Sequence, residues 1–279
     1  MQVKNCFAVN VCKFSKRIRS ATAVAGLVGL AGIASATPMT GPAVDLSFPG
    51  PNGLFPEGWL ATTITLNTGS GNIVNSRVAA GMFGGVATSV AGGFDASLLY
   101  RSQGDVLAYC IDILNNLLKS QNTYHVNDIT QNMVVDHAGV RRDFGRTLSF
   151  LGAANQVAKQ QFGISEGEKN WLNPNTKWMS AAIQVGIWES LYEKDATPLT
   201  AASGWFAATT LGVLGDKFLV DSFALLNGAA PPVAVSASTV KWLQINGGQD
   251  LLVDPVDVPA PAPLLLLLSG LALLWRRSR

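Results

Sequence analysis

The sequence predicts an α+β protein, a single domain of antiparallel β-sheet packed with about three helices. Two observations lead to this fold class. Segments with alternating apolar and polar residues lie near the beginning and the end of residues 37–254, and segments with helical spacing lie between them. A stretch of roughly 220 residues is also long enough to bury the core of one domain. The segments on either side have the composition of targeting signals.

The segments before residue 115 predict strands. Two of them, "VDLSF" (44–48) and "GWLATTITLNT" (58–68), alternate between apolar and polar positions. The next two contain glycines that indicate bulges or close backbone approach, "SRVAAGMFGGVATSV" (76–90) and "GGFDASLLY" (92–100). "DVLAYCIDIL" (105–114) is the strongest strand, because its residues define two apolar faces.

The middle of the chain predicts three helices. "RDFGRTLSFLGAANQVAKQQF" (142–162) carries an apolar stripe at helical spacing. A second helix is expected to begin with Asn175 as its N-cap, and a third to cover about residues 211–226.

The chain is then expected to return to strands. They are "PPVAVSA" (231–237), "TVKWLQI" (239–245) and "QDLLV" (249–253). The last two are separated by Asn246-Gly247-Gly248, which is typical of a hairpin turn.

One glutamine in the second helix is unexpected. Ala181, Val185 and Trp188 share one apolar helical face, and Gln184 lies on that same face. A buried carboxamide needs hydrogen-bond partners, since otherwise it costs stability. The sequence therefore predicts a specific partner for Gln184.

Residues 1–36 are expected to be a signal peptide. A basic segment is followed by the uncharged run "ATAVAGLVGLAGIA" (21–34), and Ala34-Ser35-Ala36 provides a small-residue cleavage site. The apolar run is shorter than a membrane-spanning helix requires. We expect signal peptidase to release a chain that begins at Thr37.

The other end has a proline-rich, apolar and then basic order. Pro259 and Pro261 precede an apolar run from Leu264 to Trp275, and Arg276 and Arg277 follow it. The prolines keep the approach extended, and the arginines favour the cytoplasmic side of a membrane. The run is short for a permanent anchor.

This tail resembles the PEP-CTERM sorting signal of Gram-negative bacteria, which an exosortase recognises and cleaves. Residues 259–279 would form the signal and residues 255–263 the proline-rich linker, with Pro259-Ala260-Pro261 in place of the family's Pro-Glu-Pro. The resemblance implies an exported protein of the cell surface or of the extracellular matrix of a biofilm. It also implies contact with the membrane through the C-terminal segment before processing.

The charge distribution argues against a nucleic-acid partner. The chain has 20 basic and 18 acidic residues, but eight of the basic ones lie before residue 37 or after Asp257, where no acidic residue occurs. The segment between carries a net charge of −6. Nucleic-acid binding requires a basic surface.

Cys110 is the only cysteine after residue 36, so the exported chain would have no internal disulfide. A lone cysteine is either a small buried apolar residue or a thiol with a chemical role. If its sulfur attacked the Gln184 carbonyl, ammonia would leave and an internal thioester would form. That reaction needs a carboxamide held at attack distance in a site sheltered from water.

Two motifs resemble those of bacterial surface thioester domains. "YCI" (109–111) resembles their aromatic-Cys-apolar triplet, and "IQVGIW" (183–188) resembles their Thr-Gln-x-Ala-Ile-Trp helix. The resemblance implies that Cys110 and Gln184 form the thioester, and that Tyr109, Ile187 and Trp188 pack around it. Ile183 and Gly186 depart from the family pattern.

Other sites receive less support. His125 and His137 are expected to be solvated, so a cysteine hydrolase lacks a placed base. Arg141, Arg142 and Arg146 are expected on a solvated helix face. We expect no metal, no cofactor and no enzymatic activity.

Two hypotheses remain. In the first, the protein is a covalent adhesin in which an amine on a surface or matrix ligand attacks the thioester. In the second, it is a structural matrix or polysaccharide-associated protein without a thioester.

Overall fold

The computed structural model describes residues 41–50, 52–67, 73–90, 106–129, 133–135, 141–163, 170–172, 174–194, 197–228 and 231–254. The expected signal peptide (1–36), the linker and sorting signal (255–279) and the expected strand at 92–100 lie outside these residues. Within the described ranges, no helix combines the length and the apolar character needed to cross a membrane.

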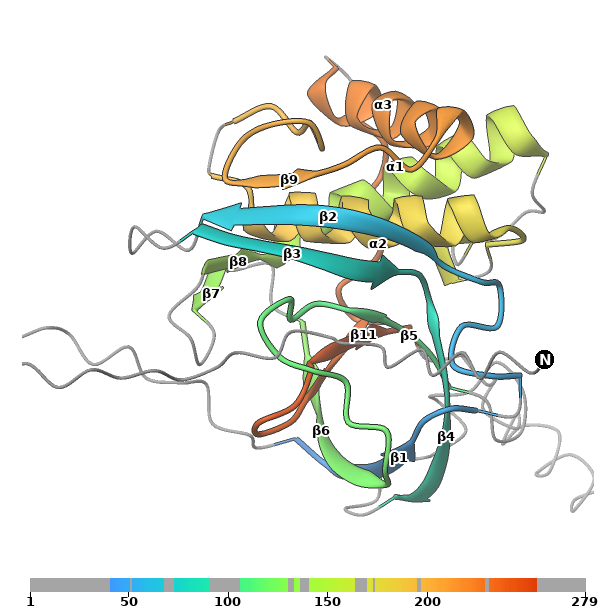
Figure 1. The fold of residues 1–279 in the computed structure, drawn as a ribbon, viewed down its shortest axis with the longest axis vertical. Helices are drawn as coiled ribbons and strands as arrows, with labels where there is room; N and C mark the ends of the chain where they lie inside the picture. Colours follow the sequence, from blue (N-terminus) through green and yellow to red (C-terminus); the bar gives the residue numbers. More distant parts are fainter. Residues whose placement is uncertain are drawn as a thin grey trace, which may run out of the picture.

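Six strands form a closed antiparallel barrel, in the order β1, β4, β5, β11, β10, β6 (Figure 1). Their bounds are β1 Ala43–Ser47, β4 Phe83–Val90, β5 Val106–Cys110, β6 Asn122–Asp128, β10 Lys241–Gln244 and β11 Leu251–Val253. Strand β11 is the last strand of the described residues, and it lies between β5 and β10. All five residues of β5 are buried, because other elements cover both faces of this strand.

A second sheet lies beside the barrel. Its central strand β2 (Leu60–Asn67) pairs with β3 (Ile73–Ala80) and β9 (Phe206–Ala208). The chain passes from β3 directly into β4 of the barrel, which Figure 1 shows as a continuous path. A short pair, β7 (Met133–Val135) with β8 (Arg141–Asp143), completes the described strands.

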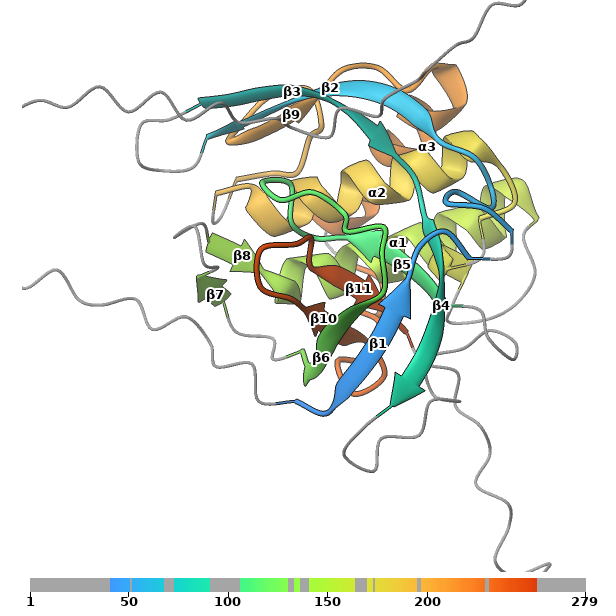
Figure 2. The same cartoon turned by 60° about the horizontal axis from the view of Figure 1, so that its bottom comes forward.

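Three α-helices pack with these sheets. They are α1 (Phe144–Phe162), α2 (Lys177–Tyr192) and α3 (Val213–Asn227), and a 3₁₀ turn, η2, covers Asn170–Leu172. Helix α2 lies between the three-stranded sheet and the barrel (Figure 2). Every residue of α2 from Met179 to Tyr192 is consequently buried.

The α+β class is confirmed, since the described chain combines three α-helices with antiparallel sheets. The hairpin expected around Asn246-Gly247-Gly248 is also confirmed, because Leu243 pairs with Leu251 across it. The barrel itself was not predicted, because its closure depends on pairs between distant segments.

Several local predictions were wrong. Thr176, not Asn175, is the N-cap of α2, and its hydroxyl accepts the backbone N–H of Met179. The cysteine strand ends at Cys110 instead of continuing to residue 114, and residues 231–237 do not form a strand. "NTYHVND" (122–128), which was not assigned to a strand, is β6.

The arginine prediction was also wrong. Arg141 and Arg142 belong to strand β8, and Arg142 is 1% exposed. Its guanidinium lies 3.0 Å from the Asp250 carboxylate and 3.6 Å from that of Asp112. Arg142 is therefore part of a buried ion-pair cluster and not of a solvated helix face.

Candidate functional site

The site begins where two barrel strands separate. Strands β4 and β5 are paired up to Phe83 and Ala108, so Cys110, the last residue of β5, extends past the end of β4. On its other side Cys110 is opposite Leu251 of β11, and the neighbouring Ile111 N–H donates to the Asp250 carbonyl. This alternation leaves the backbone groups of Cys110 facing away from β11, without a strand to pair with.

Gln184 takes the place of the missing strand. Its Oε1 accepts the backbone N–H of Cys110 at 2.9 Å, and its Nε2 donates to the Cys110 carbonyl at 2.7 Å. Both residues are buried, with Gln184 at 0% and Cys110 at 1% exposure. The backbone N–H and carbonyl of Cys110 also fix which end of the Gln184 side-chain amide carries the nitrogen, because the carbonyl needs a donor and the N–H needs an acceptor. The structure thus brings the two predicted thioester residues into direct contact.

Helix α2 supplies a second buried polar side chain that accepts a backbone N–H group. Ser180 lies one turn before Gln184, and its hydroxyl accepts the backbone N–H of Met82, just before β4, at 2.8 Å. One face of α2 therefore satisfies backbone groups of both separating strands. The sequence indicated that Gln184 is an isolated polar residue in an apolar helix. The structure shows that Ser180 has a similar role on the same helix.

The close packing of α2 explains one departure from the thioester motif. A Cβ added to Gly186 would lie 1.9 Å from the ring of Phe150, which belongs to α1 and is fully buried. The alanine of the family motif would overlap with this ring unless α1 moved. The glycine lets α2 lie closer to α1 than any larger residue would.

Three contacts hold the chain just after Cys110. The hydroxyl of Tyr192 donates to the Ile111 carbonyl at 2.6 Å, and Gln249 Nε2 donates to the Asp112 carbonyl at 3.0 Å. That same Asp112 carbonyl accepts the Cys110 thiol, with Sγ at 3.2 Å. The thiol is consequently held in one orientation by backbone that is itself anchored.

The environment keeps the Cys110 thiol protonated. Burial raises the pKa of Cys110 well above its usual value, and the negative charge of Asp112 raises it further. The Trp188 indole is close enough to lower this pKa somewhat, although its N–H forms no hydrogen bond of normal geometry. The protonated thiol is a weak nucleophile toward reagents in solution.

A small cavity reaches the thiol. Its volume is about 50 Å³, and most of its wall is apolar. It is lined by Leu54, Phe55, Val78, Ala79, Phe83, Cys110, Ile113, Leu117, Lys119, Trp188 and Gln249. A cavity of this size has room for the end of one flexible chain and excludes bulky groups.

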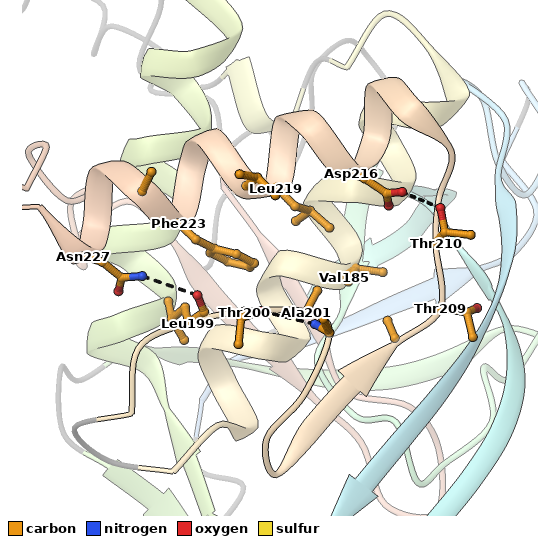
Figure 3. Close-up of a pocket in the computed structure, with 14 residues that line it drawn as sticks. Val185, Leu199, Thr200, Ala201, Thr209, Thr210, Asp216, Leu219, Phe223 and Asn227 are labelled. Carbon is orange, nitrogen blue, oxygen red and sulfur yellow. Dashed lines mark hydrogen bonds between the residues drawn. The ribbon is translucent and has the colours of Figure 1, made fainter.

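A larger cavity of about 470 Å³ lies elsewhere, between α3, β9 and the segment around Thr200 (Figure 3). Its polar side chains are already hydrogen-bonded within the protein, and the Thr209 hydroxyl accepts the backbone N–H of Thr63 at 2.8 Å. Thr210 donates to Asp216, and Asn227 donates to the Leu199 carbonyl at 3.4 Å. None of its lining residues is a cysteine or a histidine, whereas Cys110 lines the smaller cavity.

The remaining predicted site residues occupy different places. Trp188 lines the cavity of Cys110, whereas the Tyr109 ring packs 5.9 Å from that of Trp171, and Ile187 is fully buried in α2. His125 lies on β6, which is separated from β5 by two strands in either direction around the barrel, and its Nδ1 is 3.1 Å from the Gly41 carbonyl.

His137 and the sorting residues lie outside the described residues. Sequence reasoning missed Tyr192 and Gln249 as parts of the site. "QDLLV" indicated a strand next to a turn, and nothing in it indicated that its first residue lines the same cavity as the cysteine.

Comparison of the chain with protein-family models, with curated proteins and with solved structures finds no match. The function of the chain is therefore inferred from the geometry of Cys110 and Gln184 and from the motifs around them.

Proposed function

We propose that Cys110 and Gln184 form an internal thioester, and that the protein uses it to attach covalently to an amine-bearing ligand. The observation that carries this proposal is the pair of buried hydrogen bonds, 2.9 and 2.7 Å, that fix the Gln184 carboxamide against the residue bearing the thiol. Fixing two reactants in one geometry removes much of the entropic barrier to their reaction.

The same contacts support the bond-forming step. The Cys110 sulfur attacks the side-chain carbonyl carbon of Gln184, and negative charge develops on Oε1. The Cys110 backbone N–H already donates to that oxygen, so it stabilises this charge without reorganisation. The C–N bond then breaks, the thiol proton ends on the leaving nitrogen, and ammonia departs.

The surroundings favour survival of the product. The thioester would lie behind the apolar wall of the small cavity, where water is scarce. Since burial raises the pKa of the Cys110 thiol, its sulfur is a poor leaving group until a proton reaches it. Both effects slow hydrolysis of the thioester.

The ends of the sequence support a location for this chemistry. A signal peptide at 1–36 and a PEP-CTERM-like signal at 259–279 would export the protein and direct it to an exosortase. We propose a cell-surface or extracellular-matrix protein of a Gram-negative bacterium. N-terminal sequencing of the secreted protein should begin at Thr37, and retention of Arg279 in surface-displayed protein would contradict processing.

The thioester is tested by the intact mass of the freshly purified domain. It should be lighter than its sequence by one ammonia, and methylamine should restore mass by forming an amide at Gln184 and freeing the Cys110 thiol. Cys110→Ala and Gln184→Met should each abolish both effects. Ser180→Ala is the matched control, because it alters the same helix face but leaves both reacting groups in place.

The structural hypothesis is favoured by one observation. The Gln184 amide and the Cys110 thiol already have hydrogen-bond partners without a covalent bond, which is sufficient reason to bury them. It predicts full mass and no response to methylamine.

A different covalent product would also be recognised. A missing ammonia that methylamine does not restore would indicate an internal amide, with Lys119, which lines the same cavity, as the amine to examine. Either result would overturn the thioester proposal.

A further inference from the structure

We propose that Gln249 positions the incoming amine and makes the site selective for unbranched primary amines. This inference rests on the proposed thioester. Gln249 lines the cavity that reaches Cys110 and is only 5% exposed. Its Oε1 is buried and has no hydrogen-bond partner among the described residues. A buried acceptor without a partner is uncommon in a folded protein and calls for an explanation, which a donor bound in the cavity would supply.

The orientation of Gln249 is fixed by its other atoms. Nε2 faces two carbonyl oxygens, that of Asp112 at 3.0 Å and that of Asn115 at 3.4 Å. Only the amide nitrogen can donate to them, so Oε1 is turned away from both. The backbone N–H of Gln249 donates to the Asn116 carbonyl at 3.1 Å, which ties the start of β11 to the loop after Cys110. The acceptor is therefore preorganised.

The chemistry needs an acceptor of this kind. A neutral amine nitrogen attacks the thioester carbonyl carbon of Gln184 and gains positive charge as the new C–N bond forms. One of its N–H groups donates to Gln249 Oε1, and this hydrogen bond strengthens as the charge develops. A second proton passes from nitrogen to the Cys110 sulfur as the C–S bond breaks. The products are an amide at Gln184 and a free thiol at Cys110.

This sequence of events favours particular amines. A primary amine can donate one hydrogen to Gln249 and still give another to sulfur, whereas a secondary amine has a single hydrogen for both purposes. The carboxamide is too weak a base to accept the proton itself, so Gln249 is a positioning residue. The small apolar cavity adds a preference for an unbranched carbon next to nitrogen.

The first test uses the unmodified chain. Opening of the thioester by methylamine and by dimethylamine is followed by intact mass, which gives a rate for each amine. The ratio of the methylamine rate to the dimethylamine rate is then compared with the same ratio for a small peptide thioester. We expect the protein to favour methylamine by about tenfold or more beyond the peptide, as one charge-assisted hydrogen bond would provide. A ratio equal to that of the peptide would overturn the inference.

The second test uses three variants, and only the molecules that carry the thioester are followed. Gln249→Met should lower the methylamine rate about tenfold to a hundredfold, and it should remove the preference over dimethylamine. Gln249→Glu keeps an oxygen acceptor, and in its protonated form it can still donate to the Asp112 carbonyl, so it should recover part of the methylamine rate. Leu117→Met, which changes the same cavity without removing a polar atom, should behave like the original chain.

The outcomes separate the two proposals. A chain of full mass would refute the thioester, and this inference would fall with it. A chain that lacks one ammonia and whose Gln249→Met variant keeps the methylamine preference would refute only the role of Gln249. Equal changes in the methylamine and dimethylamine rates would likewise show that Gln249 merely supports the fold.

Discussion

Opening the thioester with methylamine should lower the stability of the domain. Cys110 and Gln184 lie 74 residues apart, so the bond closes a long loop. By the loop-entropy relation used for disulfides, such a cross-link stabilises the folded state by about 4 kcal/mol. Against this, the thioester has no Nε2, so the Cys110 carbonyl loses its hydrogen bond at a cost of about 1 kcal/mol. We therefore expect a net loss of about 3 kcal/mol on opening.

Urea unfolding at mildly acidic pH measures this difference, because hydrolysis and stray amines are least active there. The opened protein should unfold at lower urea with a larger m-value, since its unfolded chain is less compact. Cys110→Ala treated with methylamine is the control and should not change. A difference under about 1 kcal/mol, with opening proved by mass, would refute the cross-link reasoning.

Three further predictions concern the buried polar groups around the site. Burial raises the pKa of Glu189 from 4.5 to about 8, so its contribution to stability is complete below about pH 4.5 and is lost as the pH rises through 8. Glu189→Gln should flatten the dependence of the melting temperature on pH over that window, and an unchanged profile would contradict this assignment. Arg142→Met leaves Asp250 buried without its cation and should cost about 3–5 kcal/mol in urea unfolding, whereas a loss under about 1 kcal/mol would show that the ion pair contributes little. Ser180→Ala removes the acceptor of the Met82 N–H and should cost about 1–3 kcal/mol in the same assay, and no change would mean that this N–H finds another partner.

The sequence was sufficient to pair Cys110 with Gln184. A lone cysteine and a polar residue at an apolar helical position are both local features of the sequence. The buried carboxamide requires a partner, and the lone thiol suggests a chemical role, so the two residues could be paired. The amphipathic description of α2 was nevertheless incomplete. This helix is buried on all sides, so Ser180 and Glu189 are as enclosed as Gln184. Periodicity locates one face of a helix, and it does not reveal a second buried face.

The parts that were missed depend on contacts between distant segments. In the sequence, Arg142 resembles a member of a basic patch. In the fold, its guanidinium pairs with Asp250, which lies 108 residues further along the chain. Strand β6 carried a recognisable signal, because Tyr124 and Val126 point inward, but the polar residues between them concealed it. Gln249 gave no local signal, since its role follows only from the position of β11 beside the cysteine strand.

The position of β11 also has a consequence for the timing of synthesis. The strand that borders Cys110 is the last of the barrel, Leu251–Val253, and Gln249 and Asp250 directly precede it. A chain that emerges N-terminus first from a ribosome or an export channel therefore presents its cysteine and glutamine long before the residues that enclose them. The site becomes complete only when nearly the whole domain has emerged. Enclosure of the proposed thioester site therefore coincides with the end of folding.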